Sequence, residues 1–254
     1  MGDLARNTRT PFTSARVVDA DPVWSPDGAH LAYASDRSGR TGLYQKAANG
    51  AGGEQLLLEP SGSRSLNDWS RDARFLLYSQ VDSKTSSDLW LMPLAGDRKP
   101  TVYLNSEFNE THGQFSPDGH WIAYASDESG HPEIYVRPFP LTADSGKWTV
   151  STGGGVTPRW RRDGKELFFL TTKVHTVMVA KVSYTPTFTT TVPVPAFGAS
   201  TQNNAATGSG GPDSFNWDVT ADGQRFLLPT VATQEHSSQP PINVVVNWTA
   251  LLKK

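Results

Sequence analysis

The fold is decided by the stretch DPVWSPDG, at residues 21–28, which is followed by LAYASD at residues 31–36. A second copy, THGQFSPDG at residues 111–119, precedes IAYASD at residues 122–127. In each copy the proline presets φ for the first corner of a turn, the aspartate can bond its own backbone, and the glycine supplies a positive φ. The aromatic residue before the turn and the Ala-Tyr pair after it alternate with a period of two. This pattern predicts a β-hairpin with a strand on each side of the turn.

Three weaker copies of this unit follow the same order of aromatic residue, turn and apolar strand. The turn aspartates of the five copies are residues 27, 72, 118, 163 and 222, so they are 45, 46, 45 and 59 residues apart. A four-stranded propeller blade has a repeat of roughly 40 to 50 residues. The sequence therefore predicts an all-β fold, a β-propeller of five four-stranded blades in a single domain over residues 1–254. The longer last interval predicts an insertion, a mobile loop at about residues 200–214 that is rich in Gln, Asn, Ala, Gly and Ser.

The two ends of the chain complement each other. The last copy lacks an outer strand after the strand predicted at residues 242–248, whereas residues 8–13 have the pattern of an outer strand without a blade of their own. We expect the N-terminal strand to complete the C-terminal blade, because this removes a free sheet edge. Five blades form either the whole ring or part of a longer one. A monomer is expected in the first case, and assembly between chains is the alternative in the second.

Composition narrows the class of protein and of partner. The chain has 254 residues, is 37% hydrophobic and 19% charged, and contains 22 glycines and 18 prolines, which argues against disorder and against a helical bundle. A net charge of -2 provides no global field for nucleic acid, and the lack of cysteine excludes disulfides and thiolate metal sites. No apolar run reaches the roughly 18 residues of a membrane span, and none opens the chain as a signal peptide would. The expected location is cytoplasmic, or extracytoplasmic if the sequence belongs to a longer membrane-anchored protein.

The repeated unit resembles a known family. Trp-Ser-Pro-Asp-Gly followed by Ile/Leu-Ala-Tyr-x-Ser-Asp, with its five copies, is similar to the WD-like Pro-Asp repeat of the TolB-like β-propellers. The stretch from Glu107 to Phe168 and the closing residues 246–253 are similar, more narrowly, to the C-terminal propellers of bacterial serine/threonine kinases. The resemblance implies a sensor or interaction module, and the matching positions build blades without being catalytic. Kinase activity is not implied, because the chain has neither a Gly-rich nucleotide loop nor a His-Arg-Asp catalytic loop.

The weaker copies depart from the repeat at the turn itself. Arg71, Arg162 and Ala221 stand where the strong copies have proline, and Ala73 stands where they have glycine. Arg162 also belongs to the run Arg159-Trp160-Arg161-Arg162, in which basic and aromatic residues alternate as in some nucleic-acid platforms. Because Trp160 is the core aromatic residue of its repeat, we interpret these arginines as a solvated face and predict no nucleic-acid partner.

Candidate ligand-binding residues lie where each repeat enters its innermost strand, because propellers bind ligands at the mouth of the central channel. These residues are Asp21, Asn67, Asp68, Glu110, His112 and Asn216. Four of them are also candidate ligands for a divalent cation such as Ca²⁺, namely Asp21, Glu110, His112 and Asn216, since carboxylate and amide oxygens suit a hard cation and imidazole a transition metal. The simpler interpretation is that they are ordinary solvated residues of polar segments.

Two functions follow from these observations. The first is a non-catalytic binding or sensor module that recognises a protein or a small ligand at the channel mouth. The alternative is a metal-dependent hydrolase of the esterase, lactonase or phosphotriesterase type, in which the bound cation polarises the reacting oxygen. The sequence assigns no catalytic residue, because it contains no Gly-x-Ser-x-Gly nucleophile elbow.

Overall fold

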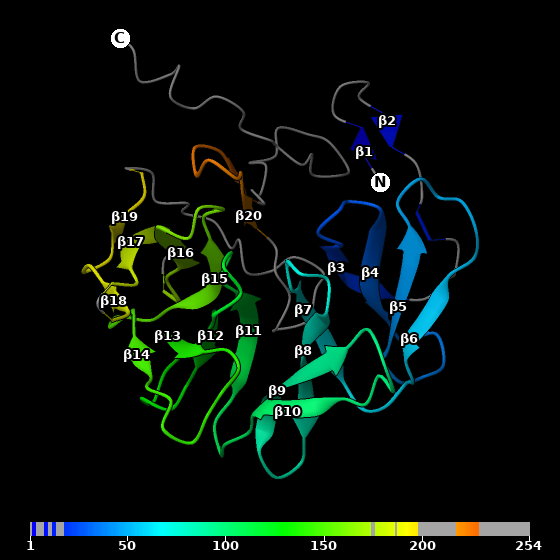
Figure 1. The fold of residues 1–254 in the computed structure, drawn as a ribbon, viewed down its shortest axis with the longest axis horizontal. Helices are drawn as coiled ribbons and strands as arrows, with labels where there is room; N and C mark the ends of the chain where they lie inside the picture. The colour runs from blue at the N-terminus through cyan, green and yellow to red at the C-terminus, as the bar shows by residue number, and fades with distance from the viewer. Residues whose placement is uncertain are drawn as a thin grey trace, which may run out of the picture.

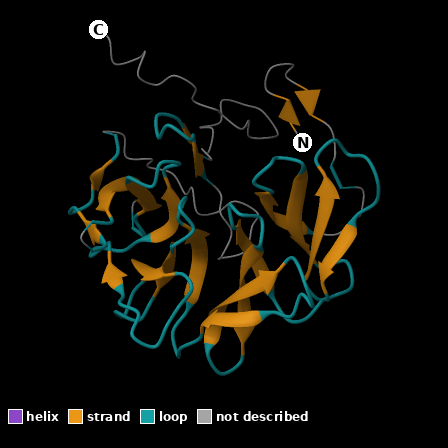
Figure 2. Ribbon diagram, viewed as in Figure 1, coloured by secondary structure: helices purple, strands orange, loops and turns teal. Residues whose placement is uncertain are grey.

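The computed structural model describes residues 2–3, 8–9, 12–13, 18–173, 176–185, 187–197 and 217–228. All regular secondary structure in these ranges is β-strand (Figure 2). The strands form antiparallel sheets that lie around a common centre, with the first strand of each repeat innermost (Figure 1). The predicted all-β propeller is therefore confirmed.

The first four repeats each form a sheet of at least four strands. The first sheet contains β3 (Asp19–Trp24), β4 (His30–Ser35), β5 (Gly42–Ala47) and β6 (Gln55–Leu58). The second contains β7 (Arg64–Trp69), β8 (Phe75–Asp82), β9 (Ser86–Pro93) and β10 (Thr101–Leu104). The third contains β11 (Glu110–Phe115), β12 (Trp121–Ser126), β13 (Glu133–Pro138) and β14 (Trp148–Thr149). The fourth contains β15 (Val156–Trp160), β16 (Glu166–Leu170), β17 (Val177–Ser183) and two short strands that pair with β17, β18 (Thr189–Thr190) and β19 (Val194–Pro195).

The fifth repeat is described in part. Its strands β20 (Asp218–Val219) and β21 (Phe226–Leu227) form an antiparallel pair. At the other end of the chain, β1 (Gly2–Asp3) pairs with β2 (Thr8–Arg9) in a separate two-stranded sheet. The side chain of Lys46, on β5, donates a hydrogen bond of 2.9 Å to the carbonyl oxygen of Phe12. The strand expected at residues 242–248 and the loop expected at 200–214 lie outside the described residues. Closure of the last blade by the N-terminal strand, and the number of blades in the ring, therefore stay predictions.

The hairpin turn explains why the same motif recurs. In the first repeat, Ser25 Oγ donates to Asp27 at 2.6 Å and accepts the N–H of His30 at 2.8 Å, while Asp27 also accepts the N–H of Ala29 at 2.9 Å. The second, third and fifth repeats form the same three bonds from Ser70, Ser116 and Thr220. The fourth repeat has Arg161 in place of the serine and keeps only the bond from the N–H of Lys165 to Asp163, at 3.0 Å. Two of the three weaker copies thus form the same hydroxyl bonds as the strong ones.

The residue after the turn aspartate has a left-handed backbone in every repeat. In four repeats this residue is a glycine with φ between 69° and 74°, namely Gly28, Gly119, Gly164 and Gly223. Glycine adopts this conformation without strain because it has no Cβ. Ala73 occupies the same place in the second repeat with φ 59°. An L-residue in this region is strained by about 1–2 kcal/mol. The second hairpin therefore carries backbone strain that the other four avoid.

The hydrophobic core lies between consecutive sheets. The first and second sheets share one cluster of buried side chains, the second and third share another, and the fourth sheet shares its last cluster with the fifth repeat. In this arrangement the inner aromatic residues Trp69, Phe115 and Trp160 pack against the preceding sheet and are at most 9% exposed. Trp24, which has no preceding sheet among the described residues, is 50% exposed. Each sheet buries both of its faces only because it has neighbours.

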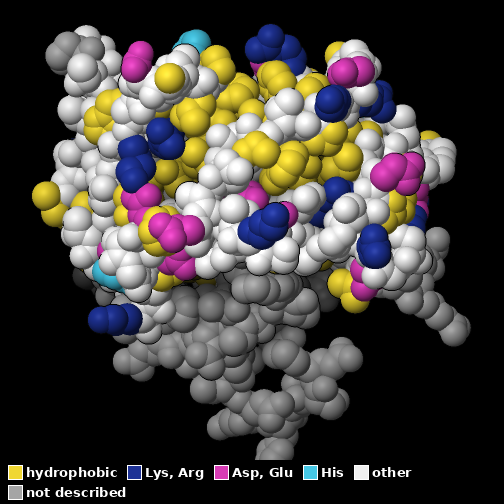
Figure 3. Space-filling model, turned by 90° about the horizontal axis from the view of Figure 1, so that it is seen from below, with side chains coloured by type: hydrophobic (Ala, Val, Ile, Leu, Met, Phe, Trp, Pro, Cys, Tyr) yellow, Lys and Arg dark blue, Asp and Glu magenta, His cyan; other side chains and the backbone are white. Residues whose placement is uncertain are grey.

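The outer surface mixes hydrophobic and charged side chains. Figure 3 shows the side that faces down in Figure 1, where yellow hydrophobic patches alternate with side chains of both charge signs. Its charged side chains form no single-sign patch, which agrees with the near-neutral net charge. Within the described part of the chain, no helix is long and apolar enough to cross a membrane.

Candidate functional site

The innermost strands are irregular at the positions where the sequence predicts ligand-binding residues. The pairing register shifts once in each of β3, β7, β11 and β15, which marks a β-bulge beside the channel. Three residues at these bulges have a left-handed backbone, namely Asp21 with φ 52°, His112 with φ 55° and Thr157 with φ 52°. Bulges re-aim side chains, and non-glycine residues with this backbone concentrate at functional sites. The channel lining is thus the part of the molecule where regular pairing is interrupted.

A cavity of about 370 Å³, the turn-side cavity, lies at the end of the channel where hairpin-turn residues of the second, fourth and fifth repeats, Arg71, Arg162 and Ala221, enter its lining. All five repeats contribute to its lining. Its polar and aromatic side chains are Asp21 and Trp24 from the first repeat, Asn67, Asp68 and Arg71 from the second, Gln114 from the third, Arg159, Trp160 and Arg162 from the fourth, and Asp218 and Thr220 from the fifth. The structure therefore places Asp21, Asn67 and Asp68 in the lining of one cavity, and their role as ligand-binding residues stays a prediction.

Asp68 joins the second sheet to the third. Its Oδ1 accepts the N–H of Trp69 at 2.8 Å, and its Oδ2 accepts the N–H of Phe115, on β11, at 2.8 Å. Burial raises the pKa of Asp68 to about 6, although the two N–H donors and the nearby Arg159 and Arg71 favour the carboxylate. The group is therefore ionised at neutral pH but is close to its titration range.

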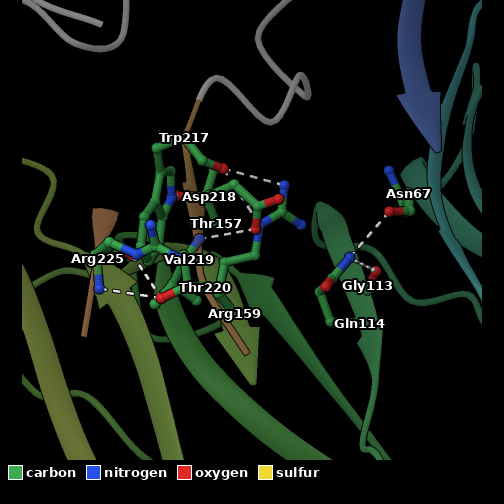
Figure 4. Close-up of polar contacts among 10 residues, drawn as sticks. All are labelled: Asn67, Gly113, Gln114, Thr157, Arg159, Trp217, Asp218, Val219, Thr220 and Arg225. Carbon is green, nitrogen blue, oxygen red and sulfur yellow. Dashed lines mark hydrogen bonds and ion pairs between the residues drawn. The ribbon is translucent and has the colours of Figure 1, made fainter. Parts of the chain in front are cut away.

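Arg159 joins the fourth sheet to the fifth repeat. Its Nε and Nη2 donate to the carbonyl oxygen of Trp217 at 3.3 and 3.2 Å, and its Nε lies 3.5 Å from Asp218 Oδ1. Trp217 returns a hydrogen bond of 2.8 Å from its indole nitrogen to Thr157 Oγ1 (Figure 4). The Arg159 side chain is only 15% exposed, and its burial lowers its pKa. The interpretation of this arginine as part of a solvated face is therefore wrong.

Asn67 and Gln114 complete the links between repeats. Gln114 Nε2 donates to the carbonyl oxygen of Asn67 at 2.9 Å (Figure 4), and Asn67 Oδ1 accepts a bond of 2.7 Å from Ser79. Trp160 Nε1 then donates to the carbonyl oxygen of Gln114 at 3.2 Å. Because hydrogen bonds from one repeat to the next hold the lining, the cavity is largely preformed, as binding sites usually are.

The remaining predicted residues do not line this cavity. His112 borders a different cavity of about 610 Å³, together with Ser86 and Asp127. Its Nδ1 lies 2.9 Å from Thr111 Oγ1, and burial lowers its pKa to about 3, so the ring is neutral at physiological pH. Glu110 is 4% exposed and its carboxylate accepts two hydrogen bonds from Ser106, while burial raises its pKa.

The predicted metal ligands are accordingly divided among separate surroundings. Asp21 lines the turn-side cavity, His112 lines the other one, and Asn216 lies outside the described residues. Among the residues that the structure describes, no three His, Asp or Glu side chains are placed so that they could hold a metal ion together. A metal site that depends on Asn216 stays a prediction.

Three arginines in the cavity lining were not predicted as site residues, namely Arg159, described above, Arg71 and Arg162. Arg71 and Arg162 both border the cavity of 370 Å³ and are exposed. The signal in the sequence was their place in the turn, where the strong copies have Pro26 and Pro117. Functional residues are expected where a repeat departs from its own pattern, and here the departure replaces the proline that stiffens the turn.

Similarity in sequence points to TolB proteins over part of the chain. No protein-family model matches it. A TolB homologue of Chlorobium luteolum is 26% identical over 130 residues, which are 49% of this chain and 28% of that protein. The Tol-Pal system protein TolB of Bordetella pertussis is 27% identical over 132 residues, 52% of this chain and 28% of that protein. The matched stretch thus spans less than a third of either relative.

Solved structures show the same fold over more of the chain. TolB from Acinetobacter baumannii superposes with a TM-score of 0.65 at 19% identity, over 87% of this chain and 51% of that one. An oligogalacturonate lyase in complex with manganese gives a TM-score of 0.64 at 14% identity over 90% of this chain and 67% of that one. The periplasmic gluconolactonase of Pseudomonas aeruginosa gives 0.59 at 14% identity over 90% and 70%.

The comparisons confirm the resemblance to TolB. The narrower likeness to the propellers of serine/threonine kinases stays a prediction. By the repeat, the fold and the partial similarity in sequence, the chain is a β-propeller that resembles TolB.

Proposed function

We propose that this chain is a non-catalytic β-propeller module that binds a protein or a small-molecule ligand at the turn-side mouth of its channel. The observation that supports this function is the cavity of about 370 Å³, to which all five repeats contribute polar or aromatic side chains. A concave site at the meeting point of several structural units, with a few convergent polar groups, is a typical ligand site. One relative is a Tol-Pal system protein, which is consistent with a binding role.

The chemistry of the lining favours binding over catalysis. Neither a histidine nor a lysine is among the described residues that border this cavity. Thr220, its hydroxyl-bearing residue, uses Oγ1 to bond Asp222 at 2.5 Å and to accept the N–H of Arg225 at 3.0 Å. A hydroxyl nucleophile needs a base within hydrogen-bond reach, and here the hydroxyl instead closes a hairpin turn.

The alternative function is the metal-dependent hydrolase that the sequence suggested. Two solved structures of similar fold are named as a lactonase and as a manganese complex of a lyase. In this chain a metal site would require Asn216 beside Asp21, Glu110 and His112, and the described members of that set lie in different surroundings. The binding module is therefore the better supported proposal.

The absence of cysteine allows a direct test of where ligands bind. In the full chain, Ala221→Cys places a single thiol on the rim of the cavity, and Lys84→Cys places one on the exposed loop between β8 and β9 as a matched control. Each variant is coupled to a nitroxide and mixed with a library of small organic fragments. Ligand-observed NMR then measures the relaxation of fragment protons beside the spin label.

We expect a set of fragments whose protons relax faster with the nitroxide at residue 221 than with the nitroxide at residue 84. This result would place binding at the turn-side mouth. If no fragment binds, or if fragments respond equally to both labels, the proposed function is wrong. Turnover of ester, lactone or phosphotriester substrates that a chelator abolishes would instead favour the hydrolase.

A further inference from the structure

The second and fourth repeats carry arginine where the first and third carry proline in the hairpin turn. Pro26 and Pro117 occupy this place in the first and third repeats, and Arg71 and Arg162 occupy it in the second and fourth. Proline is favoured at the first corner of a turn because it fixes φ. The second and fourth turns keep the backbone hydrogen bond that closes the turn in the first and third repeats. The N–H of Ala73 donates to the carbonyl oxygen of Ser70 at 2.8 Å, and the N–H of Gly164 donates to that of Arg161 at 2.9 Å. The arginines are thus not needed to form the turn.

The two arginines share their exposure and the lack of an ion-pair partner among the described residues, although Arg71 lies near enough to Asp68 to favour its carboxylate. Arg74 and Arg161, their neighbours in the same turns, do pair with the turn aspartates Asp72 and Asp163 at 2.6 and 3.3 Å. Within the described ranges, the turns therefore leave the guanidiniums of Arg71 and Arg162 without a salt bridge at the cavity.

The other charges of the cavity are largely satisfied by the chain itself. Arg159 contacts Asp218 and the carbonyl oxygen of Trp217, and both carboxylate oxygens of Asp68 accept backbone N–H groups. Asp21 is half-buried on β3. The described lining has three arginines and three aspartates and therefore no net charge. Arg71 and Arg162 are its exposed charges that form no salt bridge within the described ranges. Such a site suits a single negative charge better than a dianion.

We propose that Arg71 and Arg162 form a clamp for a carboxylate group, so that the ligand of the channel mouth is a carboxylic acid; this inference rests on the proposed binding function. A guanidinium offers two parallel N–H donors that match the two oxygens of a carboxylate. Phosphate esters carry nearly two negative charges at neutral pH and would meet the three carboxylates of the lining at greater cost. The carboxylate is therefore the better match among common anions.

The apolar part of the ligand has a place beside the clamp. A hollow of about 200 Å³ adjoins the cavity, shares Arg71 with it, and is bordered by Pro26, Trp69, Phe115 and Pro117. Proline rings and aromatic edges offer a flat apolar surface next to the guanidinium. A ligand with a carboxylate attached to a flat apolar group would use both.

The test compares three probes of the same shape on the full chain: naphthoate, its neutral amide naphthamide, and naphthyl phosphate. Saturation-transfer NMR titrations give the dissociation constant of each probe. Arg71→Pro with Arg162→Pro restores the proline of the strong copies and removes both guanidiniums, so the hairpins are expected to fold. Arg40→Gln with Lys84→Gln is the control, because it removes the same charge from exposed residues outside the cavity.

We expect naphthoate to bind about tenfold or more tightly than naphthamide, which corresponds to about 1.4 kcal/mol. The proline double variant should reduce this ratio to about one, and the control variant should leave it unchanged. Equal binding of naphthoate and naphthamide, a ratio that the proline variant does not alter, or tighter binding of naphthyl phosphate would each overturn the carboxylate clamp. In those cases the nitroxide at residue 221 still decides the proposed function, because it reports the location of binding and not its charge.

Discussion

The stability of this propeller should depend on pH through the buried carboxyl of Asp68, and the substitution Asp68→Asn tests this dependence. Its carboxylate accepts N–H groups from Trp69 and Phe115, and burial raises its pKa from 3.8 to about 6. Because one pKa unit corresponds to about 1.4 kcal/mol, the ionised carboxylate costs the folded state about 3 kcal/mol at neutral pH. The folded state binds the proton more tightly than the unfolded state. The contribution of protonated Asp68 to the free energy of unfolding is therefore fully present below pH 3.8 and is lost as the pH rises through about 6.

Asp68→Asn removes the charge while it keeps the shape of the side chain. Its amide has one acceptor oxygen for two N–H donors, so one donor loses its partner at a cost of about 1–3 kcal/mol at every pH. We expect the variant to be less stable than the wild type at about pH 4, and the difference to shrink by up to about 3 kcal/mol at about pH 7. Urea unfolding followed by tryptophan fluorescence, at several pH values for both proteins, measures this difference.

The comparison isolates Asp68, because every other titrating group is common to the two proteins and cancels in the difference. Unfolding free energies of wild type and variant that run parallel from about pH 4 to about pH 7 would refute the assignment. A difference that grows with pH would show that the carboxylate is stabilised in the folded state, contrary to its burial. Carbon chemical shifts of the Asp68 carboxyl, followed by NMR across the same range, give its pKa directly.

Three further predictions concern strain, metal and closure. Ala73→Gly should raise the free energy of unfolding by about 1 kcal/mol, because it relieves the strain of φ 59° at this position. Gly119→Ala should lower the free energy of unfolding by a similar amount, because the added Cβ would meet open space and only the left-handed backbone opposes the substitution. Calorimetric melting curves of the two variants that do not move in opposite directions would contradict this prediction. We expect that neither Ca²⁺ nor Mn²⁺ raises the melting temperature of the protein. A cation site whose dissociation constant is one hundredth of the cation concentration would instead stabilise the folded state by about 2.7 kcal/mol and raise that temperature. Deleting residues 1–13 should cause association, visible by light scattering, if the N-terminal strand closes the last blade; a truncated chain that stays monomeric and equally stable argues against closure.

Much of the fold could be predicted because its signals are local. A turn of Ser, Pro, Asp and Gly forms its own hydrogen bonds within six residues, as Ser25 and Asp27 show, so each copy of the motif identifies a hairpin. Even the copy at residues 220–223, which has Thr and Ala in place of Ser and Pro, forms the same bonds. The regular spacing of these hairpins was enough to predict a propeller.

The candidate site was predicted only in part, because side chains at the same place in successive repeats have different surroundings. Asp21 and His112 both lie at bulges with a left-handed backbone, yet Asp21 lines the turn-side cavity and His112 borders the other one. Glu110 was a reasonable metal ligand by residue type, but its carboxylate is bonded to Ser106 four residues before it. No pattern along the chain distinguishes these cases.

The sequence by itself determined the repeat, the hairpins and the alternation that places one aromatic residue on each inner strand. These depend on backbone sterics and on hydrogen bonds between residues close together in the chain. Only the tertiary structure decided that Arg71 and Arg162, about ninety residues apart, border one cavity, and that Arg159 is buried against Asp218 while they are exposed. The physical reason is that burial and charge pairing depend on the neighbouring sheet, and neighbours meet only when the sheets assemble around the channel.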